Sequence, residues 1–211
     1  MRSQDAALCA RIAYLENGRL DAAKLGFSYQ KIQKGKLSCW VGHKGSKTVV
    51  AIQGTRFMHR SSVFLEPNLK TDLVPWIGPG RVHEGYYRAF WFLMNDLKSA
   101  VSGRAEVCFT GHSMGAALAV LAGVCLGSSR IFCFASPKVG DQEFAANVNA
   151  FTRVVRFENR CDFLTRFPYR GEIKGQGKEE TGTYVHVGRR VGLTAYGHSM
   201  KAYLKGVQAE K

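Results

Sequence analysis

Residues 109–119 read FTGHSMGAALA, in which one serine is enclosed between two glycines. The run that ends in this segment, AEVCFTG, is short and continuously apolar, which predicts a buried strand. The run that follows, MGAALAVLAGVCLG, predicts a helix that is apolar nearly all round and therefore buried. A strand and a helix cross this closely only where side chains are absent, as at Gly111 and Gly115. The segment therefore requires a sheet that helices cover.

Strand and helix patterns alternate along the rest of the chain. The segments that predict strands are residues 37–42, 47–53, 105–111, 130–136 and 152–159, with a turn at 43–46 and a polar-tipped hairpin over 172–188. The segments that predict helices are an N-terminal one that Ser3 can cap, then residues 86–103, 114–127, 141–151 and 198–210. With no repeat or linker, this pattern predicts one α/β domain over residues 1–211. Its sheet is central and largely parallel, with helices on both faces.

Ser113 is either a nucleophile or a small residue in a tight turn. The pattern G-x-S-x-G is meaningful only between a strand and a helix, and Ser113 has both neighbours. In a nucleophile elbow the serine adopts a strained backbone conformation that projects its hydroxyl from the sheet. The N-terminus of the next helix points at the same place, where its free N–H groups favour a negative oxygen. The alternative is a glycine-rich turn without chemistry.

Several stretches resemble the class 3 lipases, the fungal-lipase-like family of α/β hydrolases. In chain order they are VVAIQGT, VHEGYYRAF, FTGHSMGAALA, FASPKVGDQEFA, VVRFENRCDFLTRFP, YVHVG and YGHSMKAYL, between residues 48 and 204. The chain departs from the family pattern at Gln53, where the family has arginine, and at Ala116, where the family has a second glycine. Neither departure removes a reacting group. The resemblance implies the α/β-hydrolase fold and the hydrolysis of carboxylic esters.

A serine hydroxyl needs a base to take its proton, and six histidines are available. His198 lies on an expected loop just before the last helix, where α/β hydrolases carry the base, and the resemblance implies the same position. His186 lies in TYVHVG, a strand pattern, and is the alternative base. His112 adjoins Ser113, so its side chain should point away from the hydroxyl and support the turn.

The base needs an acidic partner, which in this fold lies between the serine and the histidine in chain order. Asp141 fits a helix N-cap more simply. Glu158 lies within or at the end of the strand expected at 152–159. Asp162 falls on the loop directly after that strand, where the resemblance places the acid. The alternative role for Asp162 is a surface ion pair with one of the arginines nearby in the sequence, Arg160 or Arg166.

An ester hydrolase must stabilise the negative oxygen of a tetrahedral intermediate. One expected donor is the backbone N–H of Met114, the residue after the nucleophile. The other should come from a loop after an earlier strand. The stretch AIQGT ends such a strand, so Thr55 can offer its backbone N–H and its hydroxyl.

A long loop from Thr55 to about residue 85 carries apolar residues that an exposed loop would not favour. They are Phe57, Met58, Val63, Phe64 and Leu65. The resemblance implies a lid directly after the oxyanion residue, here residues 56–66, whose apolar underside covers the site and contacts substrate when open. Permanent packing of these side chains onto the core is the alternative.

The formal net charge is +14, and it is spread along the chain. Residues 1–150 have 18 Lys or Arg against 10 Asp or Glu, and residues 151–211 have 12 against 6. Nucleic-acid binders prefer a clustered basic stripe, so this distribution disfavours them. It favours an inert soluble surface or peripheral contact with an anionic membrane.

The six cysteines include no C-x-x-C pair, and most lie among apolar neighbours, so we expect six reduced thiols. The N-terminus lacks the apolar core of a secretion signal, and the longest apolar run, residues 116–126, is too short to span a bilayer. These features predict a soluble chain that is cytoplasmic as synthesised, with export by another route left open.

The features together predict a serine hydrolase that cleaves lipid esters through an acyl-enzyme, with Ser113, Asp162 and His198 as the catalytic residues. Triacylglycerol lipase and phospholipase A1 both fit, and the charge favours phospholipid slightly. A hydrolase-fold binding protein without catalysis is the alternative, and a basic nucleic-acid binder is a distant third. No metal or cofactor is implied, and the oligomeric state is left open.

Overall fold

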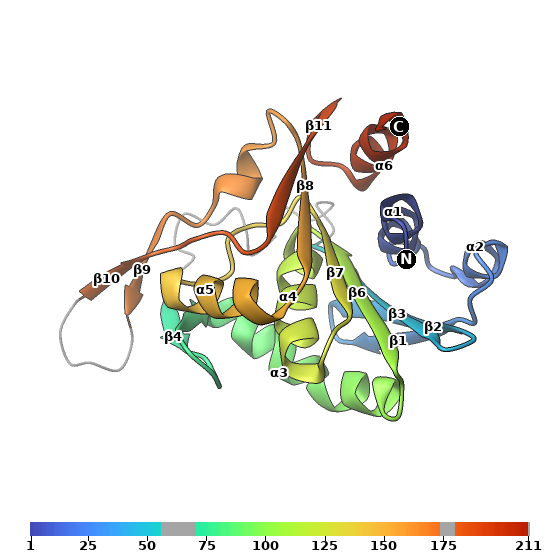
Figure 1. Ribbon diagram of the computed structural model, residues 1–211, viewed down its shortest axis with the longest axis horizontal. Coiled ribbons are helices and arrows are strands. Elements are labelled where there is room, and N and C mark those ends of the chain that lie inside the picture. Colours follow the sequence, from blue (N-terminus) through green and yellow to red (C-terminus); the bar gives the residue numbers. More distant parts are fainter. Residues whose placement is uncertain (56–70, 174–179, 211) are drawn as a thin grey trace.

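The computed structural model describes residues 1–55, 71–173 and 180–210. Their main sheet has seven strands in the order β1-β2-β3-β6-β7-β8-β11 (Figure 1). Its strands are β1 (Gln30–Lys34), β2 (Leu37–Lys44), β3 (Lys47–Ile52), β6 (Glu106–His112), β7 (Arg130–Phe134), β8 (Val154–Arg160) and β11 (Arg189–Tyr196).

The main sheet is antiparallel at one side and parallel through the rest. Strands β1, β2 and β3 pair antiparallel, whereas β3, β6, β7, β8 and β11 pair parallel, each with the next in that order. Because the carboxyl ends of parallel strands meet at one edge, the residues after β6, β7, β8 and β11 share that edge. The expectation of a largely parallel central sheet is confirmed.

Helices cover both faces of this sheet (Figure 1). Their bounds are α1 (Ser3–Ile12), α2 (Arg19–Lys24), α3 (Glu84–Val101), α4 (Met114–Leu126), α5 (Gln142–Phe151) and α6 (Met200–Ala209). Helices α3 and α4 pack together on one face, and α1 and α6 pack together on the other. Helix α4 lies directly against β3, β6 and β7, which explains why it is apolar nearly all round.

A second, four-stranded sheet lies beside the first, in the order β10-β9-β4-β5. It consists of β4 (Leu73–Pro75), β5 (Arg81–His83), β9 (Arg170–Ile173) and β10 (Glu180–Thr183). Strands β9 and β10 pair antiparallel, which confirms the expected hairpin. A short 3-10 helix, η1 (Phe163–Arg166), connects β8 to this sheet.

Several local expectations were wrong. Strand β2 extends to Lys44, so the turn before β3 is two residues rather than the four of 43–46. The N-cap of α1 is Arg2, and Ser3 is the first helical residue. His186 lies beyond β10 rather than in a strand. Strand β11 was not expected, because an edge strand whose residues are mostly exposed lacks the continuous apolar run that predicts a buried strand.

Two sequence expectations concern the whole chain. None of the six cysteines forms a disulfide, as expected. Burial raises the pKa of several of these thiols, to about 12 at Cys39 and Cys133, which keeps them protonated and unreactive. In the part of the chain that the structure describes, no helix is both long enough and apolar enough to cross a bilayer.

Candidate active site

Ser113 lies at the sharp turn between β6 and α4. Its φ is 57° and its ψ is −128°, a left-handed conformation that residues other than glycine rarely adopt. Glycine is required on both sides, since a Cβ at Gly111 would lie 2.2 Å from the Gly115 oxygen and one at Gly115 would lie 2.2 Å from the Ile52 oxygen. The crossing of strand and helix therefore holds the serine in its strained position.

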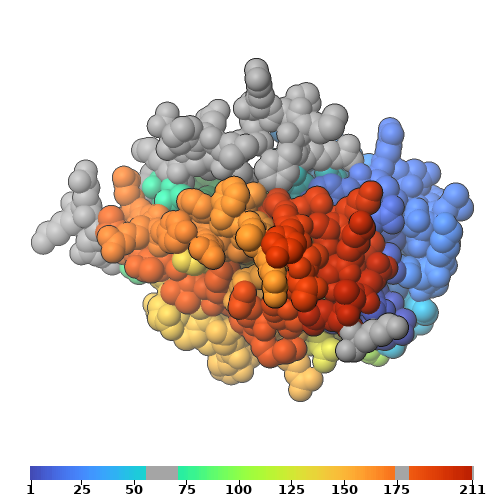
Figure 2. All heavy atoms as spheres, turned by 90° about the horizontal axis from the view of Figure 1, so that it is seen from above, coloured from blue at the N-terminus to red at the C-terminus, as the bar shows by residue number. Residues whose placement is uncertain are grey.

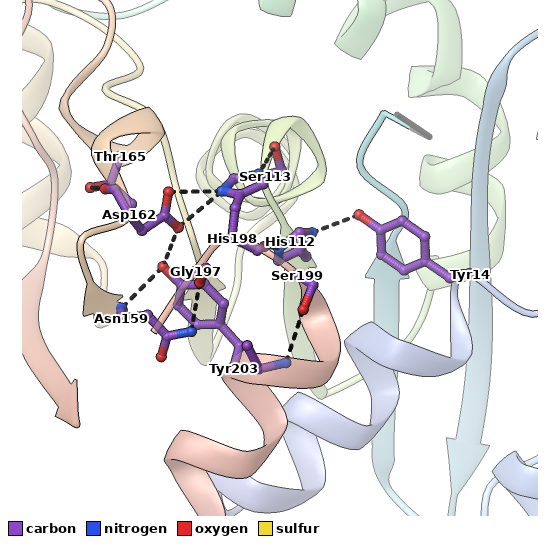
Figure 3. Close-up of polar contacts among 11 residues, drawn as sticks. Tyr14, His112, Ser113, Asn159, Asp162, Thr165, Gly197, His198, Ser199 and Tyr203 are labelled. Carbon is purple, nitrogen blue, oxygen red and sulfur yellow. Dashed lines mark hydrogen bonds and ion pairs between the residues drawn. The ribbon is translucent and has the colours of Figure 1, made fainter. Parts of the chain in front are cut away.

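Three side chains from distant parts of the chain meet at this turn (Figure 3). The Ser113 hydroxyl oxygen lies 2.9 Å from Nε2 of His198. The other ring nitrogen, Nδ1 of His198, lies 3.0 and 2.9 Å from the two carboxylate oxygens of Asp162. A carboxylate only accepts, so Nδ1 carries the ring proton and Nε2 is left to accept a proton from the serine.

The Asp162 carboxylate is held by a buried tyrosine. The hydroxyl of Tyr203, on α6, donates to Oδ2 of Asp162 at 2.6 Å, and the backbone N–H of Asn159 donates to the same hydroxyl at 3.1 Å. Burial alone would raise the pKa of Asp162, but the hydrogen bonds from His198 and Tyr203 outweigh burial and lower that pKa. The carboxylate therefore stays ionised beside the imidazole.

A second network holds His198 by its backbone. The His198 carbonyl accepts from Nε2 of His112 at 2.6 Å, so Nδ1 of His112 is an acceptor and lies 2.7 Å from the Tyr14 hydroxyl. The same hydroxyl accepts from the Gly54 N–H at 3.1 Å. Burial, followed by the neighbouring His198, lowers the pKa of His112 to about 3, so this ring is neutral. As expected, His112 points away from the serine hydroxyl and supports the turn.

The two expected oxyanion donors are neighbours. The Thr55 hydroxyl lies 3.8 Å from the sulfur of Met114, which places the end of β3 beside the start of α4. Among the described residues, no acceptor takes a hydrogen bond from either backbone N–H. Gln53, one of the two departures from the family pattern, is buried two residues before Thr55. Ala116, the other departure, is fully buried in α4.

The alternative base and acids lie elsewhere. Glu158 forms ion pairs with Arg156 and Arg190, and its carboxylate lies 3.8 Å from His186. Burial, helped by nearby cations, lowers the pKa of His186 to about 3. The Asp141 side chain accepts from the Phe144 N–H at 2.9 Å, so Asp141 is the N-cap of α5, as expected.

Two points of the sequence analysis remain, the lid and metal binding. The lid over residues 56–66, with Phe57, Met58, Val63, Phe64 and Leu65, lies outside the described residues. Across residues 1–55, 71–173 and 180–210, no group of three or more His, Cys, Asp or Glu side chains could hold a metal ion.

Sequence reasoning did not find Tyr14 or Tyr203. Tyr203 lies within YGHSMKAYL, five residues after His198, so the matched stretch already contained it. Tyr14 lies in the turn after α1, far from any recognisable stretch. A tyrosine carries no chemical signature in a sequence, because it is also a common core residue.

Known proteins resemble this chain over most of its length. The family described as "Lipase (class 3)" matches residues 49–172. Two curated relatives, the secreted mono- and diacylglycerol lipases A of Penicillium cyclopium and Penicillium camembertii, are each 28% identical over 143 residues. The aligned region is 61% of this chain, and it spans 45%, or about half, of the length of each relative.

Solved structures agree on the fold. A mutant form of a protein called MDLA from Penicillium cyclopium has a TM-score of 0.73 at 18% identity, over 93% of this chain and 80% of that one. A lipase from Rhizopus microsporus var. chinensis has a TM-score of 0.64 at 16% identity, over 89% and 77% of the two chains. These neighbours establish the α/β-hydrolase fold. Because the family match covers more than half of the sequence, this chain belongs to the class 3 lipase family.

Proposed function

We propose that this chain hydrolyses the carboxylic esters of lipids, with Ser113 as nucleophile, His198 as base and Asp162 as the acid that orients the base. The observation that carries the proposal is the contact of the Ser113 oxygen with Nε2 of His198 at 2.9 Å, at a strained turn. Such strain persists where surrounding structure enforces it, and it is concentrated at functional sites.

The proposed chemistry follows from the proton positions. Nε2 of His198 takes the serine proton as the oxygen attacks the ester carbonyl, and the resulting imidazolium faces the ionised Asp162. The tetrahedral intermediate collapses, and the alcohol leaves with the proton from Nε2. Water then attacks the acyl-enzyme by the same route and releases the fatty acid and free Ser113.

The negative oxygen of the intermediate needs donors that are already in place. We assign this role to the backbone N–H groups of Met114 and Thr55, with the N-terminus of α4 adding a favourable dipole. Met114 begins α4 directly after the nucleophile, and its sulfur contacts the Thr55 hydroxyl. Removal of one such donor costs about 3–4 kcal/mol of transition-state stabilisation in comparable enzymes.

The substrate class follows from the relatives and the charge. The curated relatives are named mono- and diacylglycerol lipases, which supports a lipid ester. The net charge of +14 supports substrates at an anionic surface, such as acidic phospholipids, and peripheral contact with such a membrane. A panel of a soluble short-chain ester, a triacylglycerol emulsion and phospholipid vesicles separates triacylglycerol lipase from phospholipase A1.

The decisive test is Ser113→Ala. Hydrolysis of every ester in the panel should fall by at least about 10⁴-fold, because the nucleophile and its proton are lost together. The matched control is Ser102→Ala, an exposed serine at the end of α3, which should retain full activity. Labelling by a fluorophosphonate should be present in the unmodified chain and absent in Ser113→Ala. Equal turnover in the Ser113→Ala and Ser102→Ala variants would overturn the proposal. If the unmodified chain showed neither turnover nor labelling, a binding protein without catalysis would be favoured.

A further inference from the structure

An exposed group of aromatic and basic side chains borders the site on the side of Asp162. It consists of the exposed Phe163, Phe167, Tyr169, Arg160 and Arg166 with the half-buried Lys138, and we call it the acid-loop rim. The three aromatic side chains are 64%, 48% and 51% exposed. Large apolar side chains that cluster on a surface mark an interaction site more often than chance exposure does.

The rim is held together by contacts of its own. The rings of Phe167 and Tyr169 meet edge to face, with their centroids 4.9 Å apart. The Lys138 ammonium lies 4.9 Å from the centroid of the Tyr169 ring, and the Lys138 N–H donates to the Phe167 carbonyl at 2.8 Å. A cation over an aromatic face is favourable, so Lys138, Phe167 and Tyr169 form one patch. Arg160, Phe163 and Arg166 belong to the stretch of chain that leads from the end of β8 to this patch.

The rim faces the same way as the nucleophile. Ser113 follows β6, Lys138 comes after β7, and Phe163 follows β8, so all three lie at the carboxyl edge of the parallel sheet. Figure 1 places the orange segment after β8 at the upper edge of the sheet. Figure 2 looks onto that edge, and the orange residues lie on the surface beside the red residues of the C-terminal part. A flat partner that covers the rim therefore lies at the same edge of the sheet as Ser113.

The charge of the rim identifies the partner. Within the described residues, no carboxylate lies within ion-pair distance of Lys138, Arg160 or Arg166. The one acidic residue of this loop, Asp162, is buried and already bound to His198 and Tyr203. Cations that pair with no carboxylate of the described residues, set among exposed aromatic rings, suit a lipid surface. There the rings enter the headgroup layer and the cations meet anionic headgroups.

We infer that the acid-loop rim docks this chain on lipid surfaces that carry anionic headgroups, with Ser113 facing the lipid. The inference rests on the proposed function only in one respect, that docking would deliver lipid esters to the site. Docking itself requires no turnover.

The opposite edge of the sheet supplies a matched comparison. An open groove there is lined by Arg130, Arg153 and Arg189, and Phe151, which is 84% exposed, lies nearby at the end of α5. Docking through that edge would turn Ser113 away from the lipid. Phe151 and Arg153 precede β8, whereas Phe163 and Arg166 follow it, so the two pairs offer the same residue types at the two ends of one strand.

The test measures vesicle binding by the Ser113→Ala chain, which separates docking from hydrolysis. The vesicles are phosphatidylcholine alone or phosphatidylcholine with about a third phosphatidylglycerol, a content at which each nearby cation contributes about fivefold in binding. Phe163→Ser with Arg166→Gln should weaken binding to the anionic vesicles at least about tenfold. Phe151→Ser with Arg153→Gln removes the same groups and should change binding less than about twofold. Binding should also fall as salt rises, because the Debye length shortens.

Three results would overturn the inference: an equal loss in both double variants, no loss in the rim variant, or binding that ignores lipid charge and salt. A dimer in solution that only the rim variant disrupts, with vesicle binding unchanged, would instead make the rim a contact between copies of this chain. If the chain with Ser113 intact bound anionic vesicles through the rim but hydrolysed no ester, the proposed function would fail and the docking surface would stand.

Discussion

Two neighbouring histidines show how environment divides roles between identical side chains. The ring centroids of His112 and His198 are 4.9 Å apart. The ring of His198 lies between a hydroxyl and an ionised carboxylate, Ser113 and Asp162. The ring of His112 lies between a backbone carbonyl and the Tyr14 phenol, both neutral.

The difference lies in what each ring meets when it gains a proton. An imidazolium at His198 would face a negative charge, which stabilises it. An imidazolium at His112 would be buried and would face His198, and the more distant Asp162 charge does not compensate, so the pKa of His112 falls to about 3. One histidine is therefore suited to carry protons and the other to hold fixed hydrogen bonds.

The largest expected effect comes from removing the carboxylate. Asp162→Asn should lower kcat on a soluble ester by about 10⁴-fold, because an amide neither selects the reactive tautomer nor stabilises the charged ring. Steady-state kinetics on the purified, folded variant measures this loss.

Glu158→Gln is the control for that variant, since it makes the same change in charge on strand β8, just before Asp162 in the chain. Glu158 is paired with Arg156 and Arg190 rather than with His198. The control should reduce thermal stability while kcat stays within about tenfold of the parent. If both variants lost activity equally, the special role of Asp162 would be wrong.

The next largest expected effect is a loss of folding stability at low pH, caused by His112. The pKa of His112 is about 3 in the folded chain against about 6.5 when unfolded, so between these values only the unfolded chain binds the proton. The free energy of unfolding should therefore fall as pH drops below about 6.5, by up to about 1.4 kcal/mol per pH unit for this group. His83 and His186 add to the slope, because burial lowers their pKa values to about 4 and about 3.

His112→Gln tests this contribution, because it removes one titrating group. Urea unfolding between pH 4 and pH 6 should show a slope smaller by about 1.4 kcal/mol per pH unit. His43→Gln, at a half-buried position on β2, should change the slope less. A slope that His112→Gln leaves unchanged would show that this ring does charge in the folded chain.

Much of the fold could be predicted because its core elements are continuously apolar. Strands β6 and β7 and helix α4 were expected near their observed places, since burial on every side leaves no polar positions to confuse the pattern. Strand β11 was missed because it lies at the sheet edge, where most of its side chains are exposed and its sequence has no continuous apolar run.

The part of the site that could be predicted consists of the residues whose types carry the chemistry. Ser113, Asp162 and His198 were named from order and context, and the structure brings their side chains into contact. Tyr14 and Tyr203 were not named, because they act through hydrogen bonds that only tertiary contacts between α1, α6 and the sheet create. The two smallest expected effects concern these tyrosines. Tyr203 contacts the carboxylate beside His198, and Tyr14 contacts His112, which holds the His198 backbone.

Tyr203→Phe removes the donor to Oδ2 of Asp162 and should lower kcat about tenfold. The carboxylate then has one fewer hydrogen bond, so it stabilises the His198 imidazolium more strongly. The acid limb of the kcat/KM profile should therefore move to higher pH. Tyr196→Phe, an exposed tyrosine at the end of β11, is the control and should change neither quantity. A loss of activity without a shift of the acid limb would make Tyr203 a packing residue only.

Tyr14→Phe should have the smallest effect, a fall in kcat of about fivefold with little change in KM. The phenol joins Gly54, next to the proposed oxyanion donor Thr55, to His112 and through it to the His198 backbone. Its loss loosens positions but changes no charge near the imidazole, so the acid limb should stay where it is. Tyr29→Phe, in which the ring stacks on Trp40 nearby, is the matched control and should retain full activity. If Tyr14→Phe moved the acid limb as Tyr203→Phe does, the two networks would be electrostatically equivalent and the contrast between the two histidines would not hold.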